Sequence, residues 1–336
     1  MSRSRQATAI AALLSNVGYR APPASGRPIS LPGHYAGLVR IGRETIAITT
    51  DTVGTKTILA ASLGQWEEVG VDAVAVNVND LASVGARPAG LVDVISCRQP
   101  EPAIFEQIGR GIYRGLQAAQ CSLLGGETAI VPELLEGVDV GGTAIGFFPR
   151  GRPPVTGKRI RPTDLLLGIP STGLHANGFT LARRVVSESR SELRARRDGA
   201  TRTLGEELLT ASRIYVAASE ALADQAGVVG FAHISGGGVR NLSRLRPGAQ
   251  FVLDRWPRPF GIFQWLQETG GIDLAEMYQT FNMGIGFVVV VRAARVAPTL
   301  RRLWRAGYAD TLIVGHVAPG RGVTLPHFGV EYTGYT

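Results

Sequence analysis

The chain has 336 residues, enough for two domains of ordinary size. It is 45% hydrophobic and 18% charged, a balance that excludes wholesale disorder. The longest apolar run, residues 287–291, is far too short for a membrane span, which needs ~20 residues. Only two cysteines, Cys97 and Cys121, are present, so we expect free thiols and a cytoplasmic protein with no membrane partner.

The net charge of +8 resembles that of nucleic-acid-binding proteins, but the kind of basic residue argues against that function. Lys56 and Lys158 are the only lysines, and arginine supplies the rest of the positive charge along the whole chain. No stripe of basic residues alternates with aromatic residues, as a nucleic-acid footprint requires. We therefore expect no nucleic-acid partner, and a basic protein that handles phosphorylated small molecules fits the charge equally well.

The spacing of apolar residues alternates between the helical and the strand period. In the first half it predicts a hairpin turning near Ile41-Gly42, helices at 56–63, 66–84 and 102–119, and strands at 90–97, 122–124 and 138–148. In the second half it predicts strands at 165–169, 251–253, 284–291 and 311–317, and helices at 177–187, 204–225, 261–269 and 294–305. The expected fold class is therefore mixed α/β (α+β), in two halves.

Proline, glycine and charge indicate the boundaries between these halves. Residues 1–33 contain no acidic residue, and we expect a short helix ending near Asn16 and then a Pro/Gly-rich mobile segment. A second segment rich in proline, glycine and basic residues lies at 151–162 and is typical of an interdomain linker. The predicted domains are 1–150, with 1–33 as a flap, and 163–336.

Three polar segments interrupt the first half. Asp51-Thr-Val-Gly-Thr-Lys56 joins a strand to a helix N-terminus, which suits a metal-bridged phosphate, although an N-cap with a surface lysine explains it equally well. Asn77-Val-Asn79-Asp80 places polar residues in an apolar helix, where they need either a magnesium ion or a satisfied polar network. Gly125-Gly126-Glu127-Thr128 is predicted to follow a strand, either as a close approach to a ligand or as a plain tight turn.

The second half carries a further group of glycine-bearing segments. These are Ser171-Thr-Gly-Leu-His175-Ala-Asn177-Gly, His233-Ile-Ser-Gly236-Gly-Gly238 and Thr280-Phe-Asn282-Met-Gly284. Three consecutive glycines form a natural anion-binding nest. His175 and Asn177 are able to donate to phosphate or carbonyl oxygen, whereas we interpret His233 as structural. His and Cys do not cluster at the spacing of metal ligands.

Together and in this order, these segments resemble the phosphoribosylformylglycinamidine cyclo-ligase (aminoimidazole ribonucleotide synthetase) family. The resemblance runs from about Gly33 to Val330 and rests on DTVGTK, VGVDAVAVNVNDLASVGARP, GGETAIVPELLEGVDVGGT, STGLHANGFTLARR, AHISGGG and WLQETGGIDLAEMYQTFNMGIG. The last segment discriminates best among relatives that share the overall plan. The wording at 33–38 and 127–139 is closest to archaeal-type members.

The resemblance implies a two-domain subunit whose N-terminal domains pair in a homodimer through a shared β-barrel, with ATP near that interface. It also implies a reaction. ATP phosphorylates the formyl oxygen of formylglycinamidine ribonucleotide, and the ribosyl-bearing nitrogen then attacks the activated carbon and expels phosphate. Positioning and charge neutralisation do most of the work in phosphoryl transfer, so no nucleophilic side chain is required.

The resemblance also implies which residues carry the function. The catalytic residues would be Asp51, Lys56, Asp80 and His175, and Mg²⁺ would lie on Asp51, Asp80 and Glu127. ATP would be held by Asp51, Gly54, Thr55, Lys56, Asn79, Asp80, Gly125, Gly126 and Glu127. The ribonucleotide substrate would be held by Ser171, His175, Asn177, Gly236, Gly237, Gly238 and Asn282.

Two departures from the family pattern leave alternatives open. Thr52 stands where the family has glycine, and the acid-free N-terminus replaces an acidic flap segment. A diverged paralogue that phosphorylates another amide or acid oxygen, and a dimeric nucleotide-binding regulator, therefore stay as alternatives to the cyclo-ligase.

Overall fold

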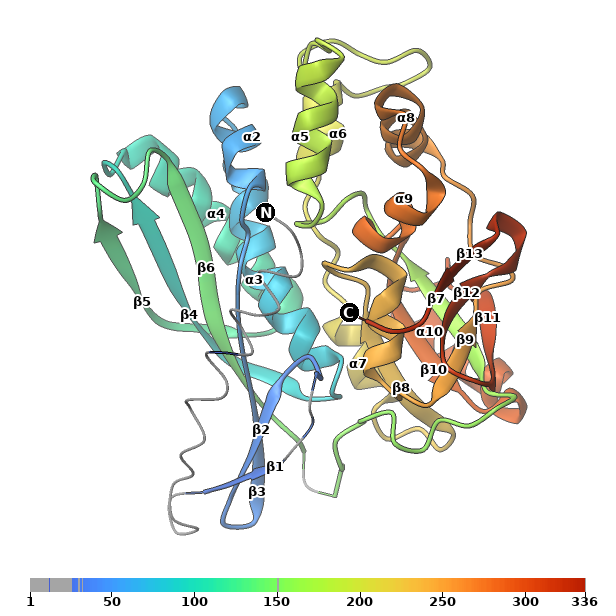
Figure 1. The fold of residues 1–336 in the computed structure, drawn as a ribbon. Helices are drawn as coiled ribbons and strands as arrows, with labels where there is room; N and C mark the ends of the chain where they lie inside the picture. The colour runs from blue at the N-terminus through green and yellow to red at the C-terminus, as the bar shows by residue number, and fades with distance from the viewer. Residues whose placement is uncertain (1–11, 13–25, 30, 32, 150, 336) are drawn as a thin grey trace.

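The computed structural model describes residues 12, 26–29, 31, 33–149 and 151–335. The described chain folds into two halves that lie side by side, each built on one β-sheet (Figure 1). The predicted N-terminal helix and most of the predicted flap fall outside the described residues.

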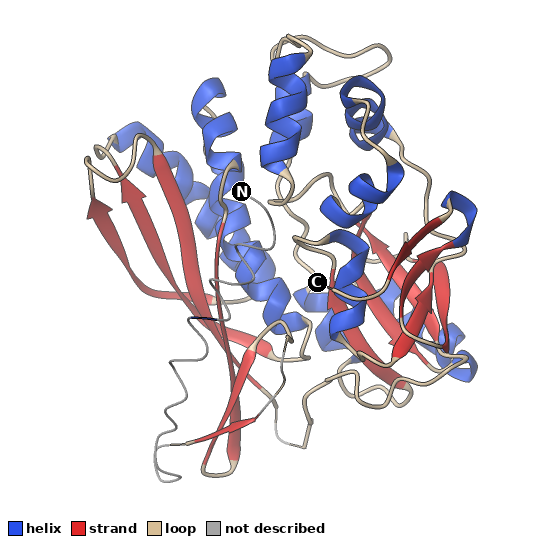
Figure 2. Ribbon diagram, in the orientation of Figure 1, coloured by secondary structure: helices blue, strands red, loops and turns tan. Residues whose placement is uncertain are grey.

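The first half is a six-stranded sheet with helices packed on one face (Figure 2). Its strands run in the order β1-β2-β3-β6-β4-β5, and only the β4–β5 pair is parallel. The strands are β1 (Arg27–Ile29), β2 (Gly37–Ile41), β3 (Glu44–Thr52), β4 (Arg87–Cys97), β5 (Ser122–Ile130) and β6 (Val138–Phe147). The predicted hairpin is confirmed, because β2 and β3 pair across a turn in which Gly42 has a φ of 59°.

Three helices cover the inner face of this sheet: α2 (Lys56–Leu63), α3 (Glu67–Ala82) and α4 (Pro102–Ala119). The sequence predicted all three to within two residues. Pro102 occupies the first turn of α4, where its missing N–H has no partner to lose. Glycines let α3 and α4 approach closely, since a side chain at Gly70 or Gly111 would collide with the backbone of the other helix.

The second half is a seven-stranded sheet in the order β13-β12-β9-β11-β7-β10-β8. Its strands are β7 (Leu165–Pro170), β8 (Val228–His233), β9 (Ala249–Val252), β10 (Ile285–Val291), β11 (Leu312–Pro319), β12 (Gly322–Leu325) and β13 (Val330–Tyr332). Its helices are α5 (Phe179–Glu188), α6 (Leu204–Leu209), α7 (Val216–Leu222), α8 (Gly261–Gly270), α9 (Leu274–Thr280) and α10 (Val296–Arg305), with 3₁₀ turns at Gly238–Arg244, Ala293–Arg295 and Pro326–Phe328.

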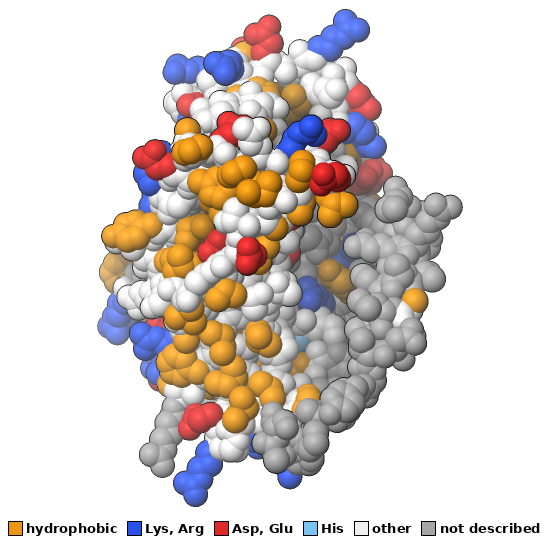
Figure 3. Space-filling model, turned by 90° about the vertical axis from the view of Figure 1, so that its left-hand side faces the viewer, with side chains coloured by type: hydrophobic (Ala, Val, Ile, Leu, Met, Phe, Trp, Pro, Cys, Tyr) orange, Lys and Arg blue, Asp and Glu red, His pale blue; other side chains and the backbone are white. Residues whose placement is uncertain are grey.

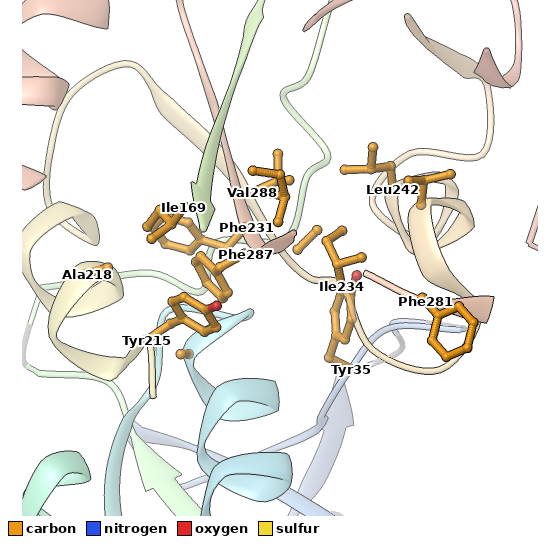
Figure 4. Packing of buried hydrophobic residues seen from close by; sticks show 14 of the residues in the cluster. Tyr35, Ile169, Tyr215, Ala218, Phe231, Ile234, Leu242, Phe281, Phe287 and Val288 are labelled. Carbon is orange, nitrogen blue, oxygen red and sulfur yellow. The ribbon is translucent and has the colours of Figure 1, made fainter. Parts of the chain in front are cut away.

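Every residue of β10, which lies between β7 and β8 in the sheet, is buried. Phe287 from this strand stacks on Tyr215, with ring centroids 5.2 Å apart, and also contacts Phe231 (Figure 4). Tyr215 precedes α7 and reaches this core from the boundary between the halves. Packing therefore continues from the second sheet to the segment that contacts α3.

Three expectations were wrong in detail. The single helix predicted at 204–225 is two helices, α6 and α7, separated by an extended segment at 210–215. The strands β1, β8, β12 and β13 and the helix α9 were not anticipated, and β1 lies inside the segment expected to be mobile. Gly125 to Thr128 do not form a turn after a strand but lie inside β5, where a bulge shifts the register between Leu123 and Gly125.

Candidate active site between the two halves

Buried side chains of α3 hold the extended segment 210–215 of the second half. Asn79 donates from Nδ2 to the carbonyl oxygen of Arg213 (2.9 Å) and accepts at Oδ1 from the N–H of Tyr215 (2.8 Å). Two turns earlier, Asp72 Oδ1 accepts from the N–H and the hydroxyl of Ser212 at 2.7 and 2.6 Å. These bonds satisfy Asn79 within the protein, so the structure gives it a structural position and not the predicted contact with ATP.

Lys56, the last residue of the Asp51–Lys56 segment, lies in the same layer. Its side chain is fully buried and its Nζ lies 2.5 Å from Asp72 Oδ2. Nζ also donates to the carbonyl oxygens of His175 (3.0 Å) and Thr210 (2.9 Å). An ammonium has three donors, and all three have partners here. This position does not support the prediction that Lys56 contacts ATP phosphates.

The carboxylates predicted to share a metal ion do not converge within one chain. Asp51 on β3 pairs with Gly142 on β6, which pairs with Asp93 on β4, so Asp51 and Asp93 lie on the helix-covered face of the sheet. Glu127 on β5 pairs instead with Val94, whose side chain lies on the outer face. Because successive side chains of a strand alternate between faces, Glu127 points away from Asp51, and the predicted three-carboxylate set is wrong for a single chain.

Asp51 and Asp80 do lie near one another at the boundary between the halves. Asp51 is accessible to solvent, but nearby protein atoms partly desolvate its carboxylate, and this desolvation raises its pKa. The neighbouring charge of Asp80 raises the pKa further. Asp80 Oδ1 lies 2.9 Å from Nδ1 of His233, so the histidine that we interpreted as structural is the partner of a predicted site residue. Asn77 donates from Nδ2 to the backbone oxygen of Asp51 (3.3 Å), and its buried Oδ1 has no partner among the described residues.

These residues fit a magnesium ion that is also bound by a nucleotide. Mg²⁺ prefers oxygen ligands and is commonly held by one or two carboxylates together with substrate phosphates. Asp51 and Asp80 supply such oxygens, whereas the unpartnered Oδ1 of Asn77 is buried. Among the described residues no group of three or more His, Cys, Asp or Glu side chains forms a complete metal cage.

The segment between β3 and α2 turns through Gly54, which has a φ of 67°. Thr55 precedes α2, is exposed, and its hydroxyl lies 3.3 Å from that of Thr180 in α5. Thr52, which replaces the family glycine, is an ordinary strand residue paired with Gly141 and has no positive φ. The substitution therefore causes no backbone strain in this loop.

Hydrogen bonds of Ser171 and Asn282 join two loops of the second half. The Ser171 hydroxyl donates to Asn282 Oδ1 (2.8 Å), and Asn282 Nδ2 donates to the carbonyl oxygen of Gly173 (2.8 Å). Asn282 Oδ1 also accepts from the N–H of Gly284 (2.9 Å), and the side chain is buried. Asn282 therefore joins two of the predicted substrate segments, while its amide has little capacity left for a ligand.

The segment from His233 to Gly238 meets these two segments at Asn177, whose Oδ1 lies beside Gly236. Asn241 donates from Nδ2 to the backbone oxygens of Ser235, Gly236 and Gly238, which holds the triple-glycine loop in shape. Gly237 and Gly238 have φ values of 105° and 56°, a conformation that favours glycine. The three segments therefore meet around Asn177, where Asn177, Gly236 and Gly237 are accessible and Gly238 is buried.

Arg244 connects this loop to the segment at residues 33–35 and to Tyr335, the last described residue. Its guanidinium donates to the backbone oxygens of Gly33 (2.6 Å) and His34 (3.0 Å) and to Asn241 Oδ1 (3.1 Å). It also lies over the rings of Tyr35 and Tyr335, 4.2 and 5.1 Å from their centroids. Sequence reasoning missed Arg244, because arginines are too frequent in this chain for one of them to stand out. It also missed Asp93, although an acidic residue in the apolar strand at 90–97 was a usable signal.

His175 is 1% exposed, so its ring does not face an open site as predicted. Its Nε2 lies 3.4 Å from the backbone nitrogens of Thr172 and Arg213, which donate to it. Burial lowers the pKa of His175 well below its usual value, and the charges of His233, Lys56 and Arg213 act in the same direction. The imidazole is therefore neutral, and its contacts with the backbone of Thr172 and Arg213 support the loop around Asn177.

The chain is similar in sequence and in fold to known proteins. The profile of "AIR synthase related protein, N-terminal domain" matches residues 33–148, and that of the corresponding C-terminal domain matches residues 161–327. The chain is 40% identical to the phosphoribosylformylglycinamidine cyclo-ligase of Thermococcus gammatolerans over 91% of its length and 89% of the relative's length. It is 42% identical to the enzyme of the same name from Methanothermobacter thermautotrophicus over 77% of each chain.

Solved structures agree on the fold. The chain matches a structure of a HypE–HypF complex with a TM-score of 0.69 at 18% identity, covering 95% of both chains. It matches AaThiL complexed with AMPPCP and TMP with a TM-score of 0.64 at 17% identity, covering 91% of this chain and 92% of the other. At these identities the likeness establishes the two-domain α/β architecture and nothing finer.

The buried imidazoles predict how stability depends on pH. The unfolded chain binds protons at its histidines below about pH 6.5, whereas the folded chain keeps His175 neutral and lowers the pKa of His34 to about 4. Stability should therefore fall as the pH drops from 6.5, by at most ~1.4 kcal/mol per pH unit for each such group. In urea unfolding at pH 7.5 and pH 5.0, His175→Gln should lose less stability between the two values than the wild type.

Exposed His327 provides the matched control, and His327→Gln should follow the wild-type pH dependence. Equal pH dependence for wild type and His175→Gln would show that His175 is protonated in the folded protein.

Proposed function

Because the chain belongs to the AIR synthase related family and, within it, to the phosphoribosylformylglycinamidine cyclo-ligases, we propose that it closes the imidazole ring of aminoimidazole ribonucleotide in purine biosynthesis. The reaction consumes ATP and formylglycinamidine ribonucleotide and releases ADP and phosphate. The observation that carries this proposal is the 40% identity over about nine-tenths of the chain, which includes both domains. The structure supports it, because the Asp51–Lys56 segment of the first half meets the His175 loop of the second half at one boundary.

The described residues suit a reaction that depends on positioning. The formyl oxygen takes the γ-phosphoryl group while the formamide nitrogen loses its proton. The ribosyl-bearing nitrogen then attacks the formyl carbon and loses its own proton, and phosphate leaves with the formyl oxygen. Binding and orientation dominate such phosphoryl transfers. Asn177, Gly236 and Gly237 are accessible to hold the ribonucleotide. His175, Ser171 and Asn282 fix the shape of the loops around it.

ATP and Mg²⁺ are assigned to the first half. The turn at Asp51, Gly54 and Thr55 is open at the start of α2, where backbone N–H groups favour phosphate. Asp51 and Asp80 would hold Mg²⁺, which neutralises phosphate charge when bound. AaThiL, a structural neighbour, is described with the nucleotide AMPPCP, and this supports a nucleotide site in the shared fold. Gly125 and Gly126 lie three strands from Asp51 and Thr52, so any contact of these glycines with ATP involves the far edge of the sheet.

The homodimer is assigned to the outer face of the first sheet. Exposed large hydrophobic side chains gather there from three adjacent strands: Ile48, Val92, Val94, Ile145 and Phe147 (Figure 3). Monomers seldom expose a contiguous apolar face of this kind. The sheet also ends at β5, an edge strand with unpaired backbone groups. A second copy packed on this face would bury the apolar side chains and complete the barrel that the family resemblance implies.

Among the described residues, no helix has the length and apolarity needed to cross a bilayer.

The function is tested with purified protein, Mg²⁺-ATP and formylglycinamidine ribonucleotide. We expect one equivalent of ADP and of phosphate for each imidazole formed, and rescue of a purine-requiring strain blocked at ring closure. ATP hydrolysis on another amide without imidazole formation would support the diverged paralogue. ATP binding without turnover of any amidine would support the regulator.

Asp80→Asn tests the magnesium assignment. The amide keeps an oxygen for the His233 contact, so the free energy of unfolding without ligands should change by less than about 1 kcal/mol. The rise in melting temperature produced by Mg²⁺-ATP should shrink, because it depends on ligand affinity. Asp198→Asn, on the surface of the second half, is the control and should keep the full shift. An unchanged shift in Asp80→Asn would remove Asp80 from the metal site.

Val94→Glu tests the dimer interface. Val94 is 44% exposed in the single chain, so the fold should tolerate the carboxylate. Burying an unpaired charge in an interface is costly, and light scattering should therefore report monomers at micromolar concentration. Trp304→Glu, on the exposed side of α10, is the control and should stay dimeric. A dimer that persists in Val94→Glu would place the interface elsewhere.

A further inference from the structure

The buried ion pair between Lys56 and Asp72 joins the two loops assigned to different ligands. Lys56 begins α2 immediately after the turn assigned to ATP phosphates. Its Nζ donates to the carbonyl oxygen of His175, two residues before Asn177 in the loop assigned to the ribonucleotide. The loops are 119 residues apart in the sequence, and one ammonium group connects them.

A second contact extends the connection to the segment 210–215. Nζ donates to the carbonyl oxygen of Thr210, while Asp72 accepts from both donors of Ser212. Neither Lys56 nor Asp72 is exposed at all, so water cannot replace any of these partners. A buried charge of this kind keeps its partners, because the loss of any one leaves an uncompensated group in a medium of low polarity.

The contact also fixes an uncommon backbone conformation. His175 has a φ of 63°, in the left-handed region that few residues other than glycine adopt. Its carbonyl oxygen is the atom that Lys56 holds, and its ring is held by the N–H groups of Thr172 and Arg213. The direction in which the chain continues to Asn177 and Gly178 therefore depends on Lys56.

We infer that Lys56 is a positioning residue that couples nucleotide binding to the shape of the ribonucleotide loop, and not a ligand of the ATP phosphates. A nucleotide at the Gly54-Thr55 turn fixes the start of α2, and the Nζ contact transmits this order to His175 and Asn177. Because coupling between two sites is reciprocal, the ribonucleotide tightens nucleotide binding by the same factor. The inference depends on the proposed function for the identity of the two ligands.

The double variant Lys56→Met/Asp72→Asn removes both charges and keeps the volume, and the amide oxygen introduced at position 72 still accepts from Ser212. Calorimetry with Mg²⁺ and the non-hydrolysable nucleotide AMPPCP measures nucleotide binding with and without formylglycinamidine ribonucleotide. In the wild type we expect the ribonucleotide to tighten AMPPCP binding by about tenfold. In the double variant AMPPCP alone should bind within about twofold of wild type, and the tightening should fall to about onefold.

Ser219→Ala is the matched control. The Ser219 hydroxyl donates to the carbonyl oxygen of Ala82 (2.7 Å), so it also joins the halves, but it touches neither loop. This variant should keep the wild-type coupling. If the double variant keeps it as well, Lys56 is only structural. If AMPPCP alone binds ten or more times more weakly to the double variant, Lys56 contacts phosphate and the inference is overturned.

Hydrogen exchange tests the same coupling without the ribonucleotide or any variant. AMPPCP with Mg²⁺ should slow amide exchange at residues 173–178 of the wild type, although these residues lie in the other half. Unchanged exchange there, with nucleotide bound, contradicts the coupling. Absence of imidazole formation in the activity assay would instead contradict the proposed function, so the two failures are distinguishable.

Discussion

The arrangement of the two halves depends on a buried ion pair, Lys56–Asp72, which lies between them. Lys56 and Asp72 are both inaccessible, and the partners that compensate them come from α2, α3, the loop at His175 and the segment 210–215. Breaking such a pair by removing one charge costs about 3 to 5 kcal/mol, because the other charge is left unpaired. The positions of the two halves and of the loops on both sides are therefore determined together.

A second constraint is the alternation of side chains along the strands of the first sheet. It places Asp51 and Asp93 on the inner face, with Gly142 between them, and sends Glu127 to the outer face. Asp51 and Glu127, which both lie in glycine-bearing motifs, are therefore on opposite faces of the sheet. Asp80 reaches Asp51 from α3 instead, which is why a helix and a strand build the acidic side of the site.

Local sequence patterns predicted most of the helices and longer strands. They failed where contacts between residues distant in the sequence determine the local structure. The apolar period located α2, α3 and α4, since their buried faces are continuous in the sequence. It predicted one helix at 204–225, because nothing local shows that α3 holds residues 212–215 extended. The motifs identified the loops that meet, but the burial of Lys56, Asn79 and His175 follows from the packing of the halves, which no single segment encodes.

The outer face of the first sheet explains why Glu127 lies outside the site of its own chain. Its strand is the edge of the sheet, and its side chain shares a face with Val92 and Val94. A second copy on that face would enclose the Glu127 carboxylate together with apolar side chains. An enclosed carboxylate needs a cation or hydrogen-bond donors, so the proposed dimer would have to supply one of these to Glu127. The proposed dimer interface and the environment of Glu127 are therefore linked, because both lie on the outer face of the first sheet.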